Sequence, residues 1–393
     1  MEIRRLEKEH YEASRALSQY AFQYELTPEQ LEEQREHFRP EEIWGAFEGG
    51  KLIAQLTVLD LCIYMNGAAL RMGGVAGVST WPEHRRQGAV AALIDTALQD
   101  MKAKGQTVSM LAPFSFGFYR RYGWELYVEY RSYTLEQGML PRREETAGRV
   151  ERRTAGECLD WLAPVYDAYA SRYNGTLARD GKWWKDSVLR RKKGHAAVYL
   201  QADGKPGGYL LYEVKNRQMT LHEFIALNEE ARKGLWTFVA NHDSMIDKAT
   251  VTLPSDDALP FLLDNPRIGQ ELVPYFMARI VDLPAFVAQY LFAAGAGADK
   301  LLIQVLDPHA PWNEGTWTLT VSADGTGRLE PCDPAEAHTP DAGCDIQTAA
   351  AMLFGYKRPA ELRAYGRLNA TGEAADRLER LIPRRTTYLA DFF

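Results

Sequence analysis

The stretch that decides the fold of this chain is "GVSTWPEHRRQGAVAALI", residues 77–94. It indicates the end of a strand, then a basic loop with a glycine, and then a helix that begins at once. The first N–H groups of such a helix have no partner within it, and the helix dipole adds roughly half a positive charge there. Arg85 and Arg86 supply charged donors, and Gly88 lets a ligand approach the backbone. The stretch therefore predicts a diphosphate site, although an arginine pair before a glycine is also ordinary protein surface.

Two other phosphate-binding patterns are excluded by the same residues. The loop lacks the glycines and the following Lys-Ser/Thr of a P-loop, and no G-x-G-x-x-G follows a strand. Nucleotide hydrolysis and hydride transfer therefore rank low as activities.

The segments on either side of the stretch complete an α/β unit. Upstream, Thr27 and Pro28 mark a helix start, and the turns "EGGK" (48–51) and "NGAA" (66–69) join the strands of an antiparallel meander. Downstream, the spacing of apolar residues predicts a helix that stops at Gly105, and "QTVSMLAP" (106–113) is expected to be a buried strand.

The same plan recurs in residues 150–254, with an amphipathic helix, a meander, a second helix and a strand. The corresponding segment "ALNEEARKGLW" (226–236) keeps a glycine at Gly234 but has Ala231 in place of the first arginine, and it brings two glutamates to the helix start. Carboxylates at that position oppose an anion, so we expect this copy to be a scaffold without the site. A third region of strands and helices begins near "FMARIVDLPAFVAQY" (276–290).

The composition sets the class of protein. A chain of 393 residues is long enough for two or three domains. It has no apolar run of membrane-spanning length and a charged start where a signal peptide would be apolar, so we expect a cytoplasmic protein without a membrane partner. The four scattered cysteines favour free thiols over a zinc site or disulfides, and no metal is expected. The net charge of −7 argues against a nucleic-acid partner and allows a cationic one.

The order of elements resembles the acetyl-coenzyme A site of the GNAT N-acetyltransferases. A strand, an R-x-x-G loop and a helix are followed by a strand that ends in "LAPFSFGFYRRYGWE" (111–125). The resemblance implies acetyl-CoA as co-substrate, in a cleft where the two strands splay apart. One departure is Val90, where the family often has Gly or Ala. The residues implied to hold pantetheine are Val78, Ser79 and Thr80, those implied for the pyrophosphate are Arg85, Arg86, Gln87, Gly88, Ala89, Val90 and Ala91, and Phe114 and Ser115 complete the coenzyme site.

Over its whole length the chain resembles the enhanced intracellular survival (Eis) family. This implies an α/β (α+β) fold with two GNAT-type domains in tandem, at residues 1–148 and 149–280, and a sterol-carrier-protein-like domain at 281–393. The family assembles as a hexamer and acetylates amines, including aminoglycosides in some members. By the same resemblance, Tyr119 in "FYRRYG" would be the general acid and the C-terminal carboxylate of Phe393 the base. A phenol suits the first task because its pKa of about 10 lies near a thiol's ~8.5.

Several neighbouring residues compete for these roles or have structural interpretations. Tyr122 is the alternative acid, and His84 is expected to be a solvated loop residue facing the phosphates. His222 and His242 are expected to pack or pair within the second copy. Trp183 and Trp184 are expected to cover a core, with a platform for a cationic sugar as the alternative, and "RRKK", Arg190 to Lys193, is expected to be a solvated face.

Three functions remain in competition. The first is an acetyl-CoA-dependent N-acetyltransferase acting on a cationic small molecule, aminoglycoside-like or polyamine-like. The second is a protein or peptide lysine N-acetyltransferase. The third is a lipid-carrier or scaffold protein with a vestigial first domain, and the intact Arg85, Arg86 and Gly88 argue against it.

Overall fold

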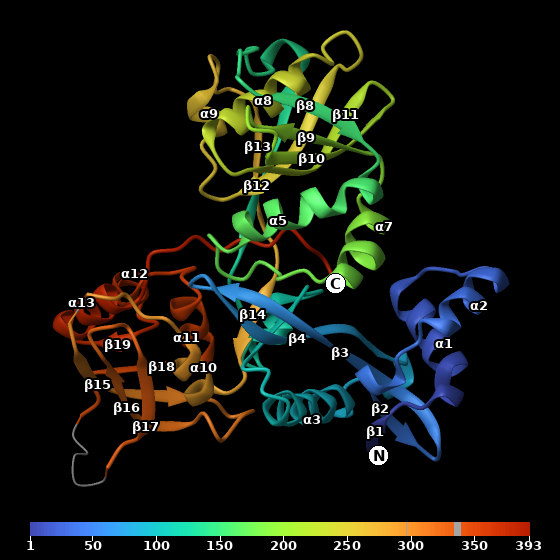
Figure 1. Ribbon diagram of the computed structural model, residues 1–393. Coiled ribbons are helices and arrows are strands. Elements are labelled where there is room, and N and C mark those ends of the chain that lie inside the picture. The colour runs from blue at the N-terminus through green and yellow to red at the C-terminus, as the bar shows by residue number, and fades with distance from the viewer. Residues whose placement is uncertain (296, 334–338) are drawn as a thin grey trace.

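The computed structural model describes residues 1–295, 297–333 and 339–393 of the chain. Figure 1 shows three lobes that meet near the C-terminus, one for each of three sheets, with α1 and α2 standing out at the N-terminal end of the first. None of the described helices is both long and apolar enough to cross a bilayer. All four cysteines are free thiols, as expected.

The first sheet has the strand order β1-β2-β3-β4-β5-β14-β6. The predicted meander is confirmed, because β2, β3 and β4 pair antiparallel through the two turns found in the sequence. The predicted helix start is confirmed too, since the Thr27 side chain accepts from the N–H of Gln30 and Pro28 opens the helix. The elements are β1 (Glu2–Arg5), α1 (Tyr11–Phe22), α2 (Pro28–Glu36), β2 (Ile43–Glu48), β3 (Lys51–Met65), β4 (Ala68–Thr80), α3 (Ala89–Ala103), β5 (Val108–Leu111), α4 (Phe116–Arg120), β6 (Glu125–Leu126) and β14 (Met277–Ile280).

The second sheet repeats this arrangement, with the order β13-β7-β12-β11-β10-β9-β8. Its helix α8 packs on the sheet as α3 does on the first, and its core is separate from that of the first sheet. The elements are β7 (Glu129–Glu136), β8 (Arg149–Arg153), α5 (Leu159–Ala170), α6 (Gly181–Trp183), α7 (Leu189–Arg191), β9 (His195–Leu200), β10 (Pro206–Lys215), β11 (Gln218–Ala226), α8 (Glu229–Ala240), β12 (Lys248–Pro254), α9 (Leu259–Leu262) and β13 (Gly269–Pro274).

The two sheets exchange a strand. β7 precedes residue 148 yet lies between β12 and β13 in the second sheet, while β14, which follows β13, lies between β5 and β6 in the first. Residues 174–178 also pair with the end of β3, through a bridge between Ile63 and Leu177. The boundary expected at residue 148 therefore does not separate the sheets, because backbone hydrogen bonding carries each sheet across it.

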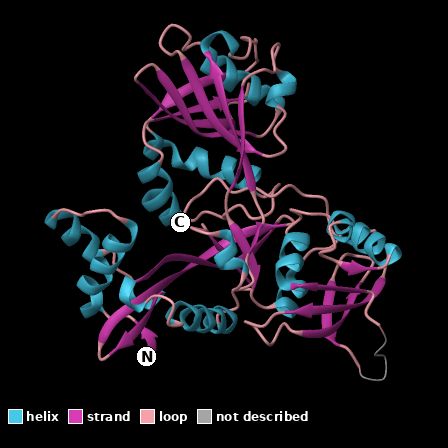
Figure 2. Ribbon diagram, turned by 180° about the vertical axis from the view of Figure 1, so that it is seen from behind, coloured by secondary structure: helices cyan, strands magenta, loops and turns pink. Residues whose placement is uncertain are grey.

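The third sheet has the order β17-β16-β15-β18-β19, with helices packed against it. Figure 2 shows this domain beside the first sheet, whose strands run from the N-terminal lobe to the centre of the molecule. The elements are α10 (Leu283–Gln289), β15 (Asp299–Leu306), β16 (Gly315–Val321), β17 (Gly327–Pro331), β18 (Ala342–Asp345), α11 (Ile346–Leu353), α12 (Pro359–Ala364), β19 (Asn369–Ala370) and α13 (Gly372–Leu381).

Candidate active site

The predicted cleft opens where β4 and β5 separate. The two strands pair in parallel from Met72 and Val108 to Val75 and Leu111, and then only β4 continues, to Thr80. On its other edge β4 stays paired with β3, with a bulge at Gly77, whose φ is +60°. The backbone of residues 77–80 therefore presents an unpaired edge to the cleft, and this stretch contains Val78, Ser79 and Thr80.

The N-terminus of α3 lies directly after this edge and is open. Gly88 is its N-cap with φ +86°, no side chain caps the helix, and its first turn has no acidic residue. Arg86 also has a positive φ, of +63°, a conformation that tips consecutive N–H groups toward one side. The first N–H groups of α3 are consequently available to an anion.

The side chains around this helix end differ in whether they already have a hydrogen-bond or ion-pair partner. Arg85 and Arg86 are exposed, and neither forms an ion pair or side-chain hydrogen bond within the described part of the chain. The Gln87 amide instead donates to the Glu83 carbonyl at 2.9 Å. Ala89 is buried, and Val90 and Ala91 are half-buried, which leaves their backbone as the part that a ligand can reach.

Tyr119 lies on α4, beyond the end of β5. Its side chain is only 3 % exposed and packs against Phe114, Phe118 and Trp124. Burial raises the pKa of Tyr119 above its ordinary value, which keeps the phenol protonated. The hydroxyl has no hydrogen-bond partner among the described residues. The Ser115 hydroxyl caps α4 by accepting from Phe118 N–H at 3.4 Å, and Phe114 is exposed at the rim.

The turn after Tyr119 is held by Arg279 of β14 and by the third domain. The buried guanidinium of Arg279 donates to the Tyr122 carbonyl and pairs with Asp307 at 2.7 Å. The Tyr122 ring packs on His309 with their centroids 4.8 Å apart, and the His309 ring lies 2.9 Å from the carboxylate of Asp95 on α3. Tyr122, the alternative acid, thus stacks against the third domain.

Phe393 lies at the base of the cleft. Its ring packs against Phe276, with centroids 4.9 Å apart, and against the backbone of Gly74, where a Cβ would lie 3.0 Å from the ring. Gly74 pairs with Met110, one residue before the strands separate. A Cβ on the preceding Gly73 would instead meet Met101 of α3, so Phe393 lies on the sheet face opposite α3. Tyr119 packs in the cluster on the α3 face, so the two residues flank the cleft from opposite faces.

Comparisons with known proteins agree with this geometry. Acetyltransferase (GNAT) domain families match residues 2–127 and 175–280, and a sterol carrier protein domain family matches residues 283–390. A probable N-acyltransferase structure from Enterococcus faecalis is 27 % identical, with a TM-score of 0.92 and coverage of 100 % of this chain and 99 % of that one. The N-acetyltransferase Eis of Mycobacterium bovis is 24 % identical over 82 % of this chain and 81 % of its own. Eis1 of Mycobacterium abscessus has the same fold, with a TM-score of 0.82 at 22 % identity and full coverage of both chains.

The chain is an N-acetyltransferase of the GNAT superfamily, and it is similar to the Eis proteins over most of its length. The predicted fold class is confirmed, with two GNAT domains in tandem and a sterol-carrier-protein-like domain. GNAT domains imply acetyl-CoA as the acetyl donor. Within the described residues, no three His, Cys, Asp or Glu side chains are grouped to hold a metal ion.

The second GNAT domain closes the position that the first leaves open. The Asn228 side chain caps α8 by accepting from the N–H of Ala231 at 2.9 Å, and Glu229 and Glu230 occupy the first turn. The interpretation of Gly234 as the counterpart of Gly88 was wrong. Gly234 lies inside α8, where a Cβ would come within 2.3 Å of the Tyr199 ring, so this glycine serves helix–sheet packing. The counterpart at the helix start is Asn228.

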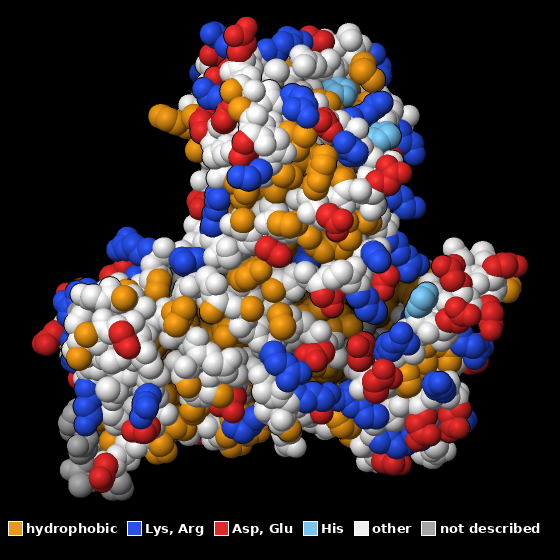
Figure 3. All heavy atoms as spheres, viewed as in Figure 1, with side chains coloured by type: hydrophobic (Ala, Val, Ile, Leu, Met, Phe, Trp, Pro, Cys, Tyr) orange, Lys and Arg blue, Asp and Glu red, His pale blue; other side chains and the backbone are white. Residues whose placement is uncertain are grey.

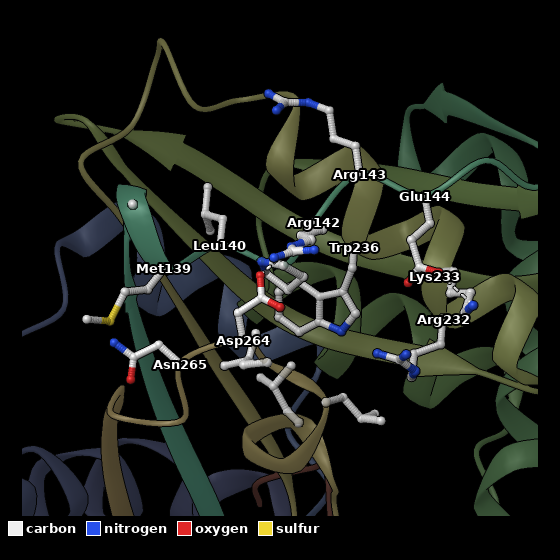
Figure 4. Close-up of a pocket in the computed structure, with 15 residues that line it drawn as sticks. Met139, Leu140, Arg142, Arg143, Glu144, Arg232, Lys233, Trp236, Asp264 and Asn265 are labelled. Atoms are coloured by element: carbon white, nitrogen blue, oxygen red, sulfur yellow. Dashed lines mark ion pairs between the residues drawn. The ribbon is translucent and has the colours of Figure 1, made fainter.

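A pocket of about 310 Å³ lies beside α8 and α9 in the second domain (Figure 4). It is lined by the Trp236 ring, by leucines and by four cations. Each of these cations already has a carboxylate partner, so none is free for a phosphate. The pairs are Arg142 with Asp264, Arg143 with Asp243, Arg232 with Glu229 and Lys233 with Glu144.

The structure corrects the expectation for the "RRKK" run. Lys192 pairs with the buried Glu223 and donates to the Ala390 carbonyl at 2.7 Å, and Arg191 donates to the Phe392 carbonyl. Two of the four cations thus hold the C-terminal tail, a long-range contact that a local charge pattern does not reveal. Trp184 is a core residue as expected, with 1 % exposure, whereas the half-buried Trp183 donates its indole N–H to Asp391 at 2.9 Å.

The three histidines stay outside the cleft. The imidazole of His84 lies 3.5 Å from Glu48 and is partly buried, so it is less solvated than expected. His242 packs between Tyr212 and Phe238. Burial lowers the pKa of His222, which favours its neutral form.

Proposed function

We propose that the chain transfers the acetyl group of acetyl-CoA to an amine of a cationic small molecule, aminoglycoside-like or polyamine-like. The observation that carries the proposal is the open N-terminus of α3 beside the splayed strands, with Tyr119 on one face of the cleft and Phe393 on the other.

The coenzyme would lie along the cleft with its pyrophosphate at α3. Arg85 and Arg86, together with the N–H groups of residues 87–91, would bind the phosphates, while the edge formed by Val78, Ser79 and Thr80 would pair with pantetheine. Phe114 and Ser115 would border the thioester from the other side of the cleft. The free side chains of the arginine pair support this placement.

The reaction would be a direct transfer. The amine nitrogen attacks the thioester carbonyl carbon, the C–N bond forms, and the C–S bond breaks as the thiolate takes the phenol proton of Tyr119. The raised pKa of Tyr119 keeps that proton in place well above neutral pH, so phenol ionisation does not limit turnover on the alkaline side below about pH 10. Acetyl transfer should therefore rise with pH as the amine loses its proton, and then level off.

The carboxylate of Phe393 would accept the proton that the amine gives up. An α-carboxyl group has a pKa of about 3.5, too low to deprotonate an ammonium efficiently, so a water relay and a substrate bound partly as free amine are required. The packing of the Phe393 ring against Gly74, next to the point where the strands separate, supports this role.

The acceptor would enter through a hollow between the lobe of α1 and α2 and the body of the molecule, which is visible in Figure 3. Residues 25–42 on one side carry seven glutamates against two arginines. Burial raises the pKa of Glu42, the neighbouring Glu41 adds to this, and the charge of Lys182 in the second domain opposes it. An acidic wall favours a cationic acceptor.

The test is a screen of amines in which release of coenzyme A thiol is measured. Aminoglycosides and polyamines should release thiol in an amine-dependent way, and lysine peptides should not. Preference for a lysine peptide would replace this proposal by the protein acetyltransferase alternative.

A second test concerns the C-terminal carboxylate. Adding residues after Phe393 should abolish turnover and leave coenzyme affinity unchanged, and full activity of the extended chain would contradict the carboxylate's role.

A further inference from the structure

The second GNAT domain supplies most of the side-chain hydrogen bonds that hold the last six residues, Tyr388–Phe393, although the third domain precedes them in the chain. The Asp391 carboxylate is buried and accepts from Arg179 at 3.0 and 3.1 Å and from the Trp183 indole at 2.9 Å. The Tyr166 hydroxyl adds a contact at 3.2 Å. Residues 388–393 are called the tail below. These contacts fix its position against the rest of the protein.

Three consecutive carbonyls of the tail also accept hydrogen bonds. The Ala390 carbonyl accepts from Lys192, the Asp391 carbonyl accepts from the Tyr275 hydroxyl at 2.9 Å, and the Phe392 carbonyl accepts from Arg191. Such a series of side-chain donors leaves the backbone little freedom immediately before Phe393.

Arg179 is the centre of this arrangement. Its guanidinium is fully buried and binds two carboxylates, Asp391 of the tail and Glu223 of β11. Burial alone would raise the pKa of Glu223, but Arg179 and Lys192 outweigh it and lower that pKa to about 2. The charges therefore balance inside the protein, and removal of either carboxylate would leave buried positive charge uncompensated.

Glu223 lies at the place in the second domain that corresponds to the cleft of the first. β11 pairs with β12 in parallel as far as Leu221 and Val251, just as β4 pairs with β5 as far as Val75 and Leu111. Glu223 lies two residues beyond the last pair, where Gly77 lies in the first domain. The strand edge that would serve a coenzyme in one domain thus carries, in the other, the carboxylate that orients Arg179.

We propose that Arg179, oriented by Glu223, is a positioning residue for acetyl transfer, which acts by fixing Asp391 and hence the Phe393 carboxylate. This inference rests on the proposed role of that carboxylate. It assigns the second GNAT domain a part in the reaction without a coenzyme of its own.

The experiment compares Asp391→Asn with Asp299→Asn, a matched control in which a partly buried carboxylate that also pairs with an arginine, Arg377, is neutralised in the third domain. Carboxypeptidase A, which removes C-terminal aromatic residues, reports on the tail through the rate of phenylalanine release. Turnover and acetyl-CoA affinity are measured on the same folded samples.

Asp391→Asn should release phenylalanine at least about tenfold faster and turn over at least about tenfold more slowly, with coenzyme affinity within about twofold of the parent. Asp299→Asn should match the parent in all three. Slower turnover with unchanged phenylalanine release would overturn the positioning role and leave the role of the carboxylate standing. Faster release with unchanged turnover would overturn the carboxylate's role, and with it this inference.

A second variant covers the case in which Asp391→Asn does not fold. Lys192→Met keeps the pair of Arg179 and Asp391 and removes only the donor to the Ala390 carbonyl and one partner of Glu223. It should shift release and turnover in the same directions, by about two- to fivefold. No shift in either quantity would count against the positioning role.

Discussion

The starts of α3 and α8 occupy the same place in two copies of one domain plan, yet only the first is open. At α3 no side chain caps the helix and two arginines are free, whereas at α8 an asparagine caps the first turn and two glutamates occupy it. A helix N-terminus attracts anions only while its N–H groups lack other acceptors. From this difference we expect acetyl-CoA to bind at α3 and not at α8.

The short helices α4 and α9, which follow the next strand in each copy, also differ in a residue with a proposed chemical role. α4 carries Tyr119 as its fourth residue after Phe116, Gly117 and Phe118, while α9 reads Leu259, Pro260, Phe261 and Leu262. The phenylalanine is present in both copies, and the phenol of the first is a leucine in the second. The second copy therefore has a capped helix start in place of the open one and a leucine in place of the phenol.

The largest effect is expected for Tyr119→Phe. Loss of proton donation should lower turnover by about 10² to 10⁴-fold and leave acetyl-CoA affinity nearly unchanged, because the ring packing is kept. Steady-state kinetics with calorimetry measures both. Leu262→Ala, at the matching place in α9, should have no effect on turnover. A comparable fall in Tyr122→Phe with none in Tyr119→Phe would show that the other ring donates the proton.

The next effect distinguishes the two helix starts. Replacing Arg85 and Arg86 together by Ala should weaken acetyl-CoA binding by about 10² to 10⁴-fold, because each charged hydrogen bond contributes about 1.5 to 3 kcal/mol. The double replacement of Arg232 and Lys233 by Ala in α8 should leave the affinity unchanged, since both cations are paired with glutamates. Equal losses for the two pairs would abolish the contrast between the domains.

The smallest effect separates the two glycines. The new Cβ of Gly88→Ala meets no atom within 4 Å, so this variant should lower the free energy of unfolding only by the strain of the positive φ, about 1 kcal/mol. It should also weaken coenzyme binding. Gly234→Ala should leave coenzyme affinity unchanged but destabilise the fold by about 1 to 3 kcal/mol, because its Cβ would collide with the buried Tyr199 ring. Thermal melts and calorimetry on both variants test this, and weaker binding in Gly234→Ala would contradict it.

The sequence predicts the local features of the site well. Turn residues, helix caps and the R-x-x-G loop act through neighbours a few residues away, so the meander, the start of α2 and the open end of α3 could all be read from it. The strand exchange was missed because β7 and β14 form as strands in either sheet, and only long-range pairing decides which one they join. The roles of Arg179 and Lys192 were missed for the same reason.

Gly234 shows a second limit. Within the sequence it looks like the loop glycine of the first copy, but α8 begins after Asn228, about six residues earlier, whose side-chain amide oxygen caps the helix. An asparagine followed by two glutamates is a helix-start signal, and it identifies Asn228 as the counterpart of Gly88.

The central claim is that one coenzyme site exists per chain, at α3. Isothermal titration of the full 393-residue chain with acetyl-CoA tests it most directly. We predict a stoichiometry of one per chain for the parent protein and no measurable binding at the same concentrations after the double replacement of Arg85 and Arg86 by Ala. A stoichiometry of two, or an unchanged affinity in that variant, would contradict the account.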